Sequence, residues 1–126
     1  MSLELESLVL GSLTSNVRED GTTIVVEMSG SADMESVDPL NAHLAGLHRE
    51  ALRTKATEVA IDFRQLEFMS SSCIKAFVEW ISNIQELAPV ERYRVQFRSN
   101  PQLRWQKRSL HSLHCFASDL ITVVES

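Results

Sequence analysis

An apolar run that leads directly into three serines constrains this chain more than any other stretch. The run, Val59 to Phe63, is apolar at every position except Asp62, as expected of an interior strand covered on both faces. After the serines at Ser70 to Ser72, apolar residues recur at intervals of three or four, which is the pattern of an amphipathic helix ending near Leu87. The stretch therefore predicts a strand that delivers hydroxyl groups to the N-terminus of a helix.

The remaining segments predict a sheet built around that strand. Asp20-Gly21 is a strong hairpin signal between two extended segments, and a helical crossover after the hairpin makes the next strand parallel to the second arm. The other predicted elements are strands at 13–18, 22–29, 93–98 and 120–124, helices from Asp38-Pro39 to about Arg53 and from Asn100-Pro101, and an extended N-terminal segment with Leu3, Leu5, Leu8 and Leu10. We expect an α/β fold of order β-β-α-β-α-β-α-β, with helices packed against a central mixed β-sheet of four to six strands.

Length and charge limit the class of protein. The 126 residues fit one domain, residues 1–126, and a net charge of −5 argues against binding nucleic acid through broad phosphate attraction. No apolar run approaches a membrane helix, and the first residues lack the features of a signal peptide, which predicts a cytoplasmic protein without a membrane segment. Late basic residues between Arg92 and Arg108 form either a docking surface or, as we favour, ordinary solvated faces.

Signatures of catalysis are scarce. The four glycines are isolated, so there is no glycine-rich phosphate loop, and the serine run lacks the flanking glycines of a nucleophile elbow. His111 and His114 lie three residues apart next to Cys115, but no carboxylate or second cysteine follows at zinc-ligand spacing. We expect no enzyme activity, metal or cofactor, and we expect Cys73 and Cys115 to be reduced and buried, in preference to a redox switch at Cys73.

The residues around the serines resemble a known family. The pattern strand-Asp-x-x-x-Leu-x-Phe-Met-x-Ser-Ser-x-Ile, followed by a helix, resembles the STAS domain of sulfate transporters and anti-sigma-factor antagonists. In the anti-anti-sigma members an Asp-Ser-Ser-Gly segment occupies this place, and an anti-sigma kinase phosphorylates the first serine of the pair. By that resemblance the phosphoacceptor is Ser71, with Ser70 in place of the Asp and Cys73 in place of the Gly.

The resemblance implies a phosphorylation-regulated protein-interaction switch. Its partners would be a serine/threonine kinase of the anti-sigma type and a metal-dependent protein phosphatase. The Ser-Ser-Cys-Ile-Lys-Ala run is also similar to a STAS-like branch that regulates a diguanylate cyclase. A third interpretation is an adaptor or nucleotide-binding STAS domain without phosphorylation, which the missing Asp at Ser70 favours.

Several side chains are expected to surround the phosphoacceptor. The preference of serine for the N-cap position predicts that Ser70 caps the helix and that the hydroxyl of Ser71 is available in the first turn. The predicted partner-binding residues are Met69, Ser70, Ser72, Lys75 and Glu79. Trp80 falls outside the main apolar stripe, so it is either a partly exposed binding anchor or, as we favour, packed at the edge of the core. Asp62 is expected to bond the backbone of the next turn.

Overall fold

The described part of the chain forms a six-stranded sheet with three α-helices. The computed structural model describes residues 8–10 and 12–125. The elements are β1 (Leu8–Leu10), β2 (Leu13–Asp20), β3 (Thr23–Ala32), η1 (Met34–Ser36), α1 (Val37–Arg53), β4 (Glu58–Met69), α2 (Ser71–Gln85), η2 (Pro89–Glu91), β5 (Arg94–Ser99), α3 (Arg104–Phe116) and β6 (Ile121–Glu125). The predicted order and the α/β class are confirmed, with β1 as the additional N-terminal strand; Leu3 and Leu5 lie outside the described residues.

The strands lie side by side in chain order, from β1 to β6. β1, β2 and β3 are antiparallel, whereas β3, β4, β5 and β6 are parallel. The parallel pairing of β3 with β4 across α1 confirms the predicted crossover. Because Gly21 has a φ of +64°, it suits the tight turn of the predicted β2–β3 hairpin.

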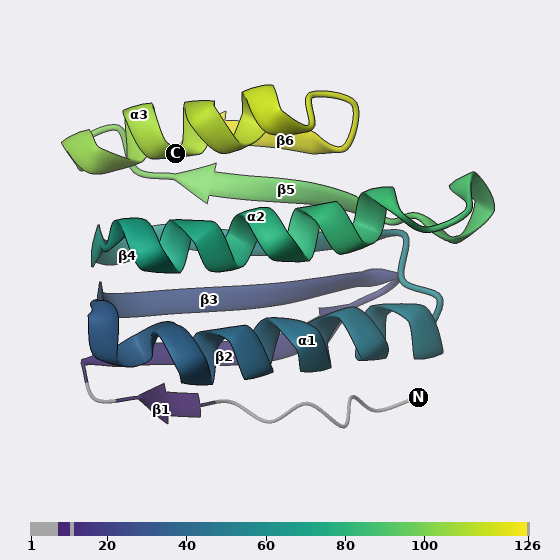
Figure 1. The fold of residues 1–126 in the computed structure, drawn as a ribbon, viewed down its shortest axis with the longest axis horizontal. Coiled ribbons are helices and arrows are strands. Elements are labelled where there is room, and N and C mark those ends of the chain that lie inside the picture. The colour runs from purple at the N-terminus through teal and green to yellow at the C-terminus, as the bar shows by residue number, and fades with distance from the viewer. Residues whose placement is uncertain (1–7, 11, 126) are drawn as a thin grey trace.

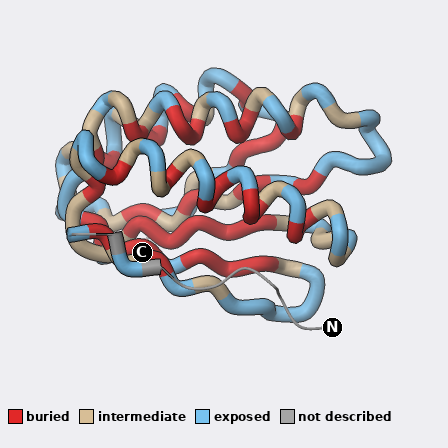
Figure 2. The backbone as a smooth tube through the Cα atoms, turned by 60° about the horizontal axis from the view of Figure 1, so that its bottom comes forward, coloured by how far each residue is buried: buried red, intermediate tan, exposed pale blue. Residues whose placement is uncertain are grey.

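The three α-helices cover one face of the sheet (Figure 1). The core lies between the helices and that face, where the inward residues of β3 and β4 meet the apolar stripes of α1 and α2. Figure 2 shows buried positions along the central strands and alternating burial along the helices, as amphipathic helices require. The opposite face of the sheet carries the Arg18–Glu27 and Asp62–Arg64 ion pairs, together with the buried apolar side chains of Val25 and Ala60.

β4 continues six residues beyond the predicted run, to Met69, because β3 also continues where a turn was expected. Two register shifts in the β3–β4 ladder let Ala32 pair with Met69. Gly30 permits this with a φ of +87°, and a Cβ there would lie 1.9 Å from the carbonyl oxygen of Ser12. The predicted polar turn beginning at Gly30 is therefore wrong for its first three residues.

Three predicted helix boundaries differ from the structure. α1 begins at Val37 rather than after a cap at Asp38, because η1 runs directly into it and the capping carboxylate is that of Asp33, which accepts from the Glu35 N–H. α3 begins at Arg104 rather than at Asn100-Pro101, since the Asn100 side chain closes a turn by accepting from the Gln102 N–H.

α2 ends at Gln85, two residues before the predicted end. The Arg92 guanidinium donates to the carbonyl oxygens of Gln85 and Leu87, at 2.7 and 3.1 Å. It thereby binds carbonyl groups that have lost their partners at the helix terminus.

Candidate functional site

Ser70 builds the corner between β4 and α2. Its backbone is extended, with φ −70° and ψ 158°, and its hydroxyl oxygen accepts a hydrogen bond from the Cys73 N–H at 3.3 Å. Its carbonyl oxygen accepts from the Ile74 N–H, and its own N–H donates to the carbonyl of Ala32 in β3 at 2.8 Å. Ser70 is therefore the N-cap of α2, as predicted, and it also ties the helix to the sheet.

Ser71 is the first residue of α2, and its side chain is exposed, whereas Ser72 is half-buried. The first N–H groups of a helix have no partner within the helix, and Ser70 binds only those of Cys73 and Ile74. The N–H groups of Ser71 and Ser72 therefore lie at the positive end of the helix dipole. An anion attached to the Ser71 hydroxyl would be next to them.

A line of exposed polar side chains runs along α2 from this corner. Ser71, Lys75 and Glu79 are all exposed, and their spacing of four residues places them on one face of the helix. Lys75 is thus one turn from the Ser71 hydroxyl. Met69, in contrast, is only 5% exposed and belongs to the hydrophobic core beneath the corner.

Two exposed apolar side chains near this corner were missed from the sequence. Met34, in η1, is 75% exposed, and η1 is joined to α2 by the Cys73 thiol, which donates to the Asp33 carbonyl at 3.3 Å. Phe68 is 49% exposed and lies two residues before Ser70. Successive side chains of a strand point to opposite faces, so the sequence could have shown that either Phe68 or Met69 faces outward. Met34 lies in an irregular segment, whose periodicity gives no signal.

Cys73 packs beneath the serines as a structural thiol. It is fully buried, as predicted, and burial raises the pKa of its thiol above the ordinary value. Reactive cysteines have a lowered thiol pKa and partial exposure. The local environment therefore disfavours a reactive thiolate at the start of α2.

Trp80 packs at the edge of the core, which is the interpretation that we favoured over a partly exposed binding anchor. Its side chain is 2% exposed, and its Nε1–H donates to the hydroxyl of Tyr93 at 2.9 Å. That hydroxyl lies 2.6 Å from Nδ1 of His48, so Tyr93, which precedes β5, closes over the edge of the α2 stripe. Trp80 is consequently a core residue and is not available as a binding anchor.

Asp62 has the structural role predicted for it. Its Oδ1 accepts from the backbone N–H of Arg64 at 3.0 Å, and Oδ2 lies 2.7 Å from the Arg64 guanidinium. Burial opposes ionisation of this carboxyl, but the hydrogen bonds and charge of Arg64 outweigh burial and lower its pKa. The pair lies within β4, away from the serine corner.

The other sequence features do not assemble into a second polar centre. Cys115 is exposed, contrary to the prediction, and its thiol lies 3.4 Å from Nε2 of His111, one turn earlier in α3. Among the residues that the structure describes, no group of three or more histidine, cysteine, aspartate or glutamate side chains is placed to hold a metal ion. None of the helices in the described part of the chain has the length and hydrophobicity needed to cross a membrane.

The sequence also matches a known protein family over the region that contains the strand, the capped serine corner and the amphipathic helix. The family described as "Mlab, STAS domain" matches residues 15–111. The chain belongs to the STAS-domain family. No curated protein sequence matches this STAS domain.

Solved structures of similar fold include anti-sigma-factor antagonists. One, from Mycobacterium paratuberculosis, has 17% identity and a TM-score of 0.65, over 90% of this chain and 86% of that one. Another, the antagonist SpoIIAA in its unphosphorylated form, has 16% identity and a TM-score of 0.57, over 87% of each chain. The Bacillus cell fate determinant SpoIIAA in its phosphorylated form has 19% identity and a TM-score of 0.54, over 87% of this chain and 90% of that one. At these identities the likeness establishes the STAS fold.

Proposed function

We propose that this STAS domain is a phosphorylation-regulated switch for protein interaction, of the anti-anti-sigma-factor type, with Ser71 as the phosphoacceptor. The observation that carries the proposal is the exposed Ser71 hydroxyl at the first position of α2. A kinase needs an accessible hydroxyl, and the hydroxyl of Ser70 is already engaged as the helix cap. Ser70 also supplies the capping oxygen that an aspartate would supply at that place, so the corner does not require the aspartate.

The switch acts through the interface and not through refolding. A phosphate on Ser71 adds about −1.5 to −2 charges. The helix N-terminus and Lys75 both favour that charge, each by less than about 1 kcal/mol, so the isolated domain keeps its fold. A partner that covers the corner with apolar or acidic surface would bury the same charge without a counter-ion, at a cost of several kcal/mol, or about a hundredfold in affinity.

The proposed partner surface combines polar and apolar side chains around the corner. It comprises Ser70, Ser72, Lys75, Glu79, Met34 and Phe68, with Met69 beneath. Aromatic and methionine side chains are enriched at protein interfaces, which supports including the two exposed apolar residues. The proposed partners are a serine/threonine kinase of the anti-sigma type, which both binds and phosphorylates the domain, and a metal-dependent protein phosphatase. That SpoIIAA, of similar fold, is known in unphosphorylated and phosphorylated forms supports such a cycle.

Kinase treatment and binding measurements test this proposal. The domain is incubated with ATP and a serine kinase of the anti-sigma type, and mass mapping of residues 59–87 locates the phosphate. We expect modification of Ser71, its loss in Ser71→Ala, and no change in Ser118→Ala, which alters an exposed serine elsewhere. Kinase affinity should be retained by Ser71→Ala and fall about tenfold or more in Ser71→Asp, since aspartate carries about half the charge of a phosphate. Equal affinities for the alanine and aspartate variants would contradict the proposal.

The alternative partners give different outcomes. The cyclase-regulating branch would be favoured if Ser71 carries the phosphate and the domain binds a diguanylate cyclase but no kinase of the anti-sigma type. Absence of phosphate from Ser70 to Ser72 would favour the adaptor or nucleotide-binding interpretation. A nucleotide that raises the melting temperature would then identify the second of these.

A further inference from the structure

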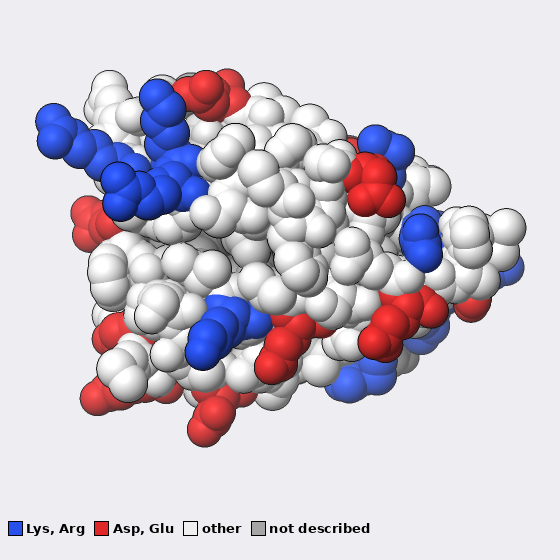
Figure 3. Space-filling view, turned by 45° about the horizontal axis from the view of Figure 1, so that its top comes forward, with Lys and Arg blue, Asp and Glu red and all other residues white. Residues whose placement is uncertain are grey.

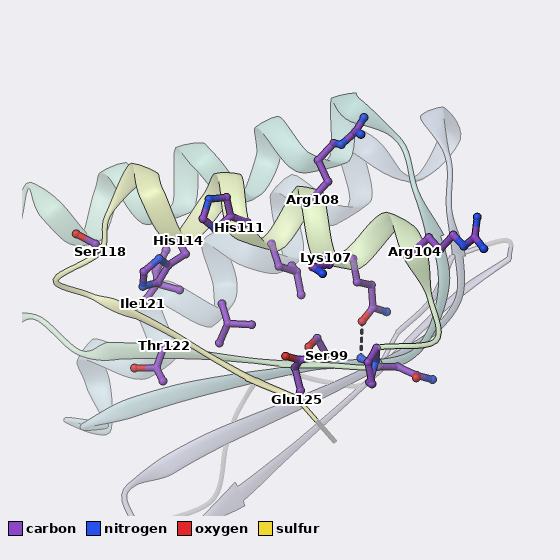
Figure 4. Close-up of a pocket in the computed structure, with 15 residues that line it drawn as sticks. Ser99, Arg104, Lys107, Arg108, His111, His114, Ser118, Ile121, Thr122 and Glu125 are labelled. Carbon is purple, nitrogen blue, oxygen red and sulfur yellow. Dashed lines mark hydrogen bonds between the residues drawn. The ribbon is translucent and has the colours of Figure 1, made fainter.

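A groove lies on the side of the molecule formed by α3 and the last strand, β6. Its volume is about 1050 Å³, and we call it the edge groove. Its apolar floor is formed by Leu110, Ile121 and Val123, and cationic side chains of α3 line it at Arg104, Lys107 and Arg108. Figure 4 shows the groove between α3 and the strands below it, with Arg104 and Arg108 extending outward from the helix.

The edge groove is positively charged on an acidic protein. The chain has a net charge of −5, yet the groove is lined by three permanent cations and by one carboxylate, that of Glu125. His111 and His114 from α3 line it as well. Figure 3 shows a group of lysine and arginine side chains at one end of the molecule, while the rest of that face carries acidic side chains with single basic ones among them. This distribution favours an anionic occupant and opposes a second copy of the chain, which would bring cations against cations.

β6 presents an edge that lacks the usual protection against pairing. Within the described sheet, β6 pairs with β5 alone. Edge strands are commonly protected from pairing by lysine, proline or a β-bulge. The sequence of β6, Ile-Thr-Val-Val-Glu, contains no lysine or proline, and its ladder with β5 has no register shift that would mark a bulge. Its β-branched residues favour extended pairing.

The outward backbone groups of β6 belong to the residues that line the groove. The Val95 N–H donates to the Leu120 carbonyl, and in a parallel ladder the residues that face the neighbouring strand alternate. Thr122 and Val124 therefore direct their backbone groups to β5, whereas Ile121, Val123 and Glu125 direct theirs outward. These last three residues line the edge groove, together with Thr122. An added strand would thus form backbone bonds at the edge while every second side chain entered the groove.

We propose that the edge groove binds an acidic extended segment of a partner protein, which adds to β6 as a seventh strand. Backbone hydrogen bonds to Ile121 and Val123 supply the pairing, as in other cases of strand addition. Carboxylates on alternate residues of the segment meet Lys107 and its neighbouring arginines. This site is separate from the serine corner, so the domain can hold two partners or two parts of one partner.

A short, end-blocked peptide of alternating glutamate and threonine tests the proposal. Fluorescence anisotropy measures its affinity for the full chain, and hydrogen exchange reports on the amides of β6. We expect binding that weakens as salt is raised, slower exchange at Ile121 and Val123, and about tenfold or more weaker binding when lysine replaces glutamate in the peptide. Peptide N-methylated at alternate residues, which removes backbone donors, should also bind about tenfold or more weakly.

Variants of the chain separate the charge contribution from the backbone contribution. Lys107→Glu with Arg108→Glu should weaken binding about tenfold or more, because two attractions become repulsions. The matched control, Arg49→Glu with Lys55→Glu, makes the same change in net charge at exposed positions on and after α1 and should bind as the parent does. Val123→Pro removes an outward N–H without breaking the ladder to β5 and should weaken binding by a similar factor.

Three results would overturn the proposal. The first is undiminished binding of the N-methylated peptide, which would mean that charge alone holds the peptide. The second is equal loss of binding in the two charge-reversed pairs. The third is a chain that dimerises through β6, seen as a dimer in light scattering that Val123→Pro converts to a monomer.

Discussion

The two serines that begin α2 should differ in what they contribute to stability. Ser70→Ala removes the acceptor of the Cys73 N–H, and loss of a capping side chain costs about 0.5–2 kcal/mol. The 3.3 Å distance from Oγ to N is long for such a bond and Ser70 is half-buried, so we expect the free energy of unfolding to fall by about 1 kcal/mol. Ser71→Ala removes an exposed hydroxyl that does not cap the helix and should change it by less than about 0.5 kcal/mol.

Urea unfolding followed by circular dichroism measures this difference. With a slope of about 1–3 kcal/mol per molar urea, a loss of 1 kcal/mol moves the midpoint by about 0.3–1 M. Ser70→Asp is the matched control: it keeps a capping oxygen and adds a charge that the helix N-terminus favours by about 0.3–1 kcal/mol, so its midpoint should equal or exceed that of the parent. Equal destabilisation by Ser70→Ala and Ser71→Ala, or failure of Ser70→Asp to restore the midpoint, would refute the assignment of Ser70 as the cap.

Two further predictions concern the core. Tyr93→Phe removes the hydroxyl that binds the Trp80 N–H and His48. Urea unfolding should show the free energy of unfolding lowered by about 2–3 kcal/mol, and a change below about 0.5 kcal/mol would contradict a stabilising role for these hydrogen bonds. Burial lowers the pKa of His43 and His48 below 6.5, so below that pH the unfolded chain binds more protons than the folded one. The free energy of unfolding should therefore be highest above about pH 6.5 and should fall as the pH drops toward about 5, before carboxylates protonate. A urea midpoint that stays constant over this range would show that neither histidine makes stability depend on pH.

Local patterns were sufficient for the centre of the fold and for the cap. The run from Val59 to Phe63 lies in the middle of the sheet and is at most 5% exposed, although helices cover only one of its two faces and not both, as the run predicted. Neighbours in sequence reveal such a buried run directly. Ser70 directly precedes a strongly amphipathic helix, so the preference of serine for the N-cap position was enough to predict its role. α1 ends at Arg53, where its apolar periodicity also ends.

Features created by distant segments were beyond the reach of local patterns. Trp80 lies at the margin of the α2 stripe, and only the approach of Tyr93 from a later segment encloses it. Asp38 carries a strong capping signal, but η1 adds a turn before the helix and moves the cap to Asp33. The edge groove depends on the spacing of α3 above β6, which no run of neighbouring residues encodes.

Strand order in this sheet has a consequence for how the polypeptide is made. Every strand from β1 to β6 lies beside its predecessor in the sequence, so each pairing closes only a hairpin or a single crossover. A chain leaving the ribosome can accordingly dock each segment onto a surface that already exists, without waiting for the segments that follow. The unit of α3 and β6 emerges after the other strands of this sheet, so β5 is a temporary border until that unit has been made.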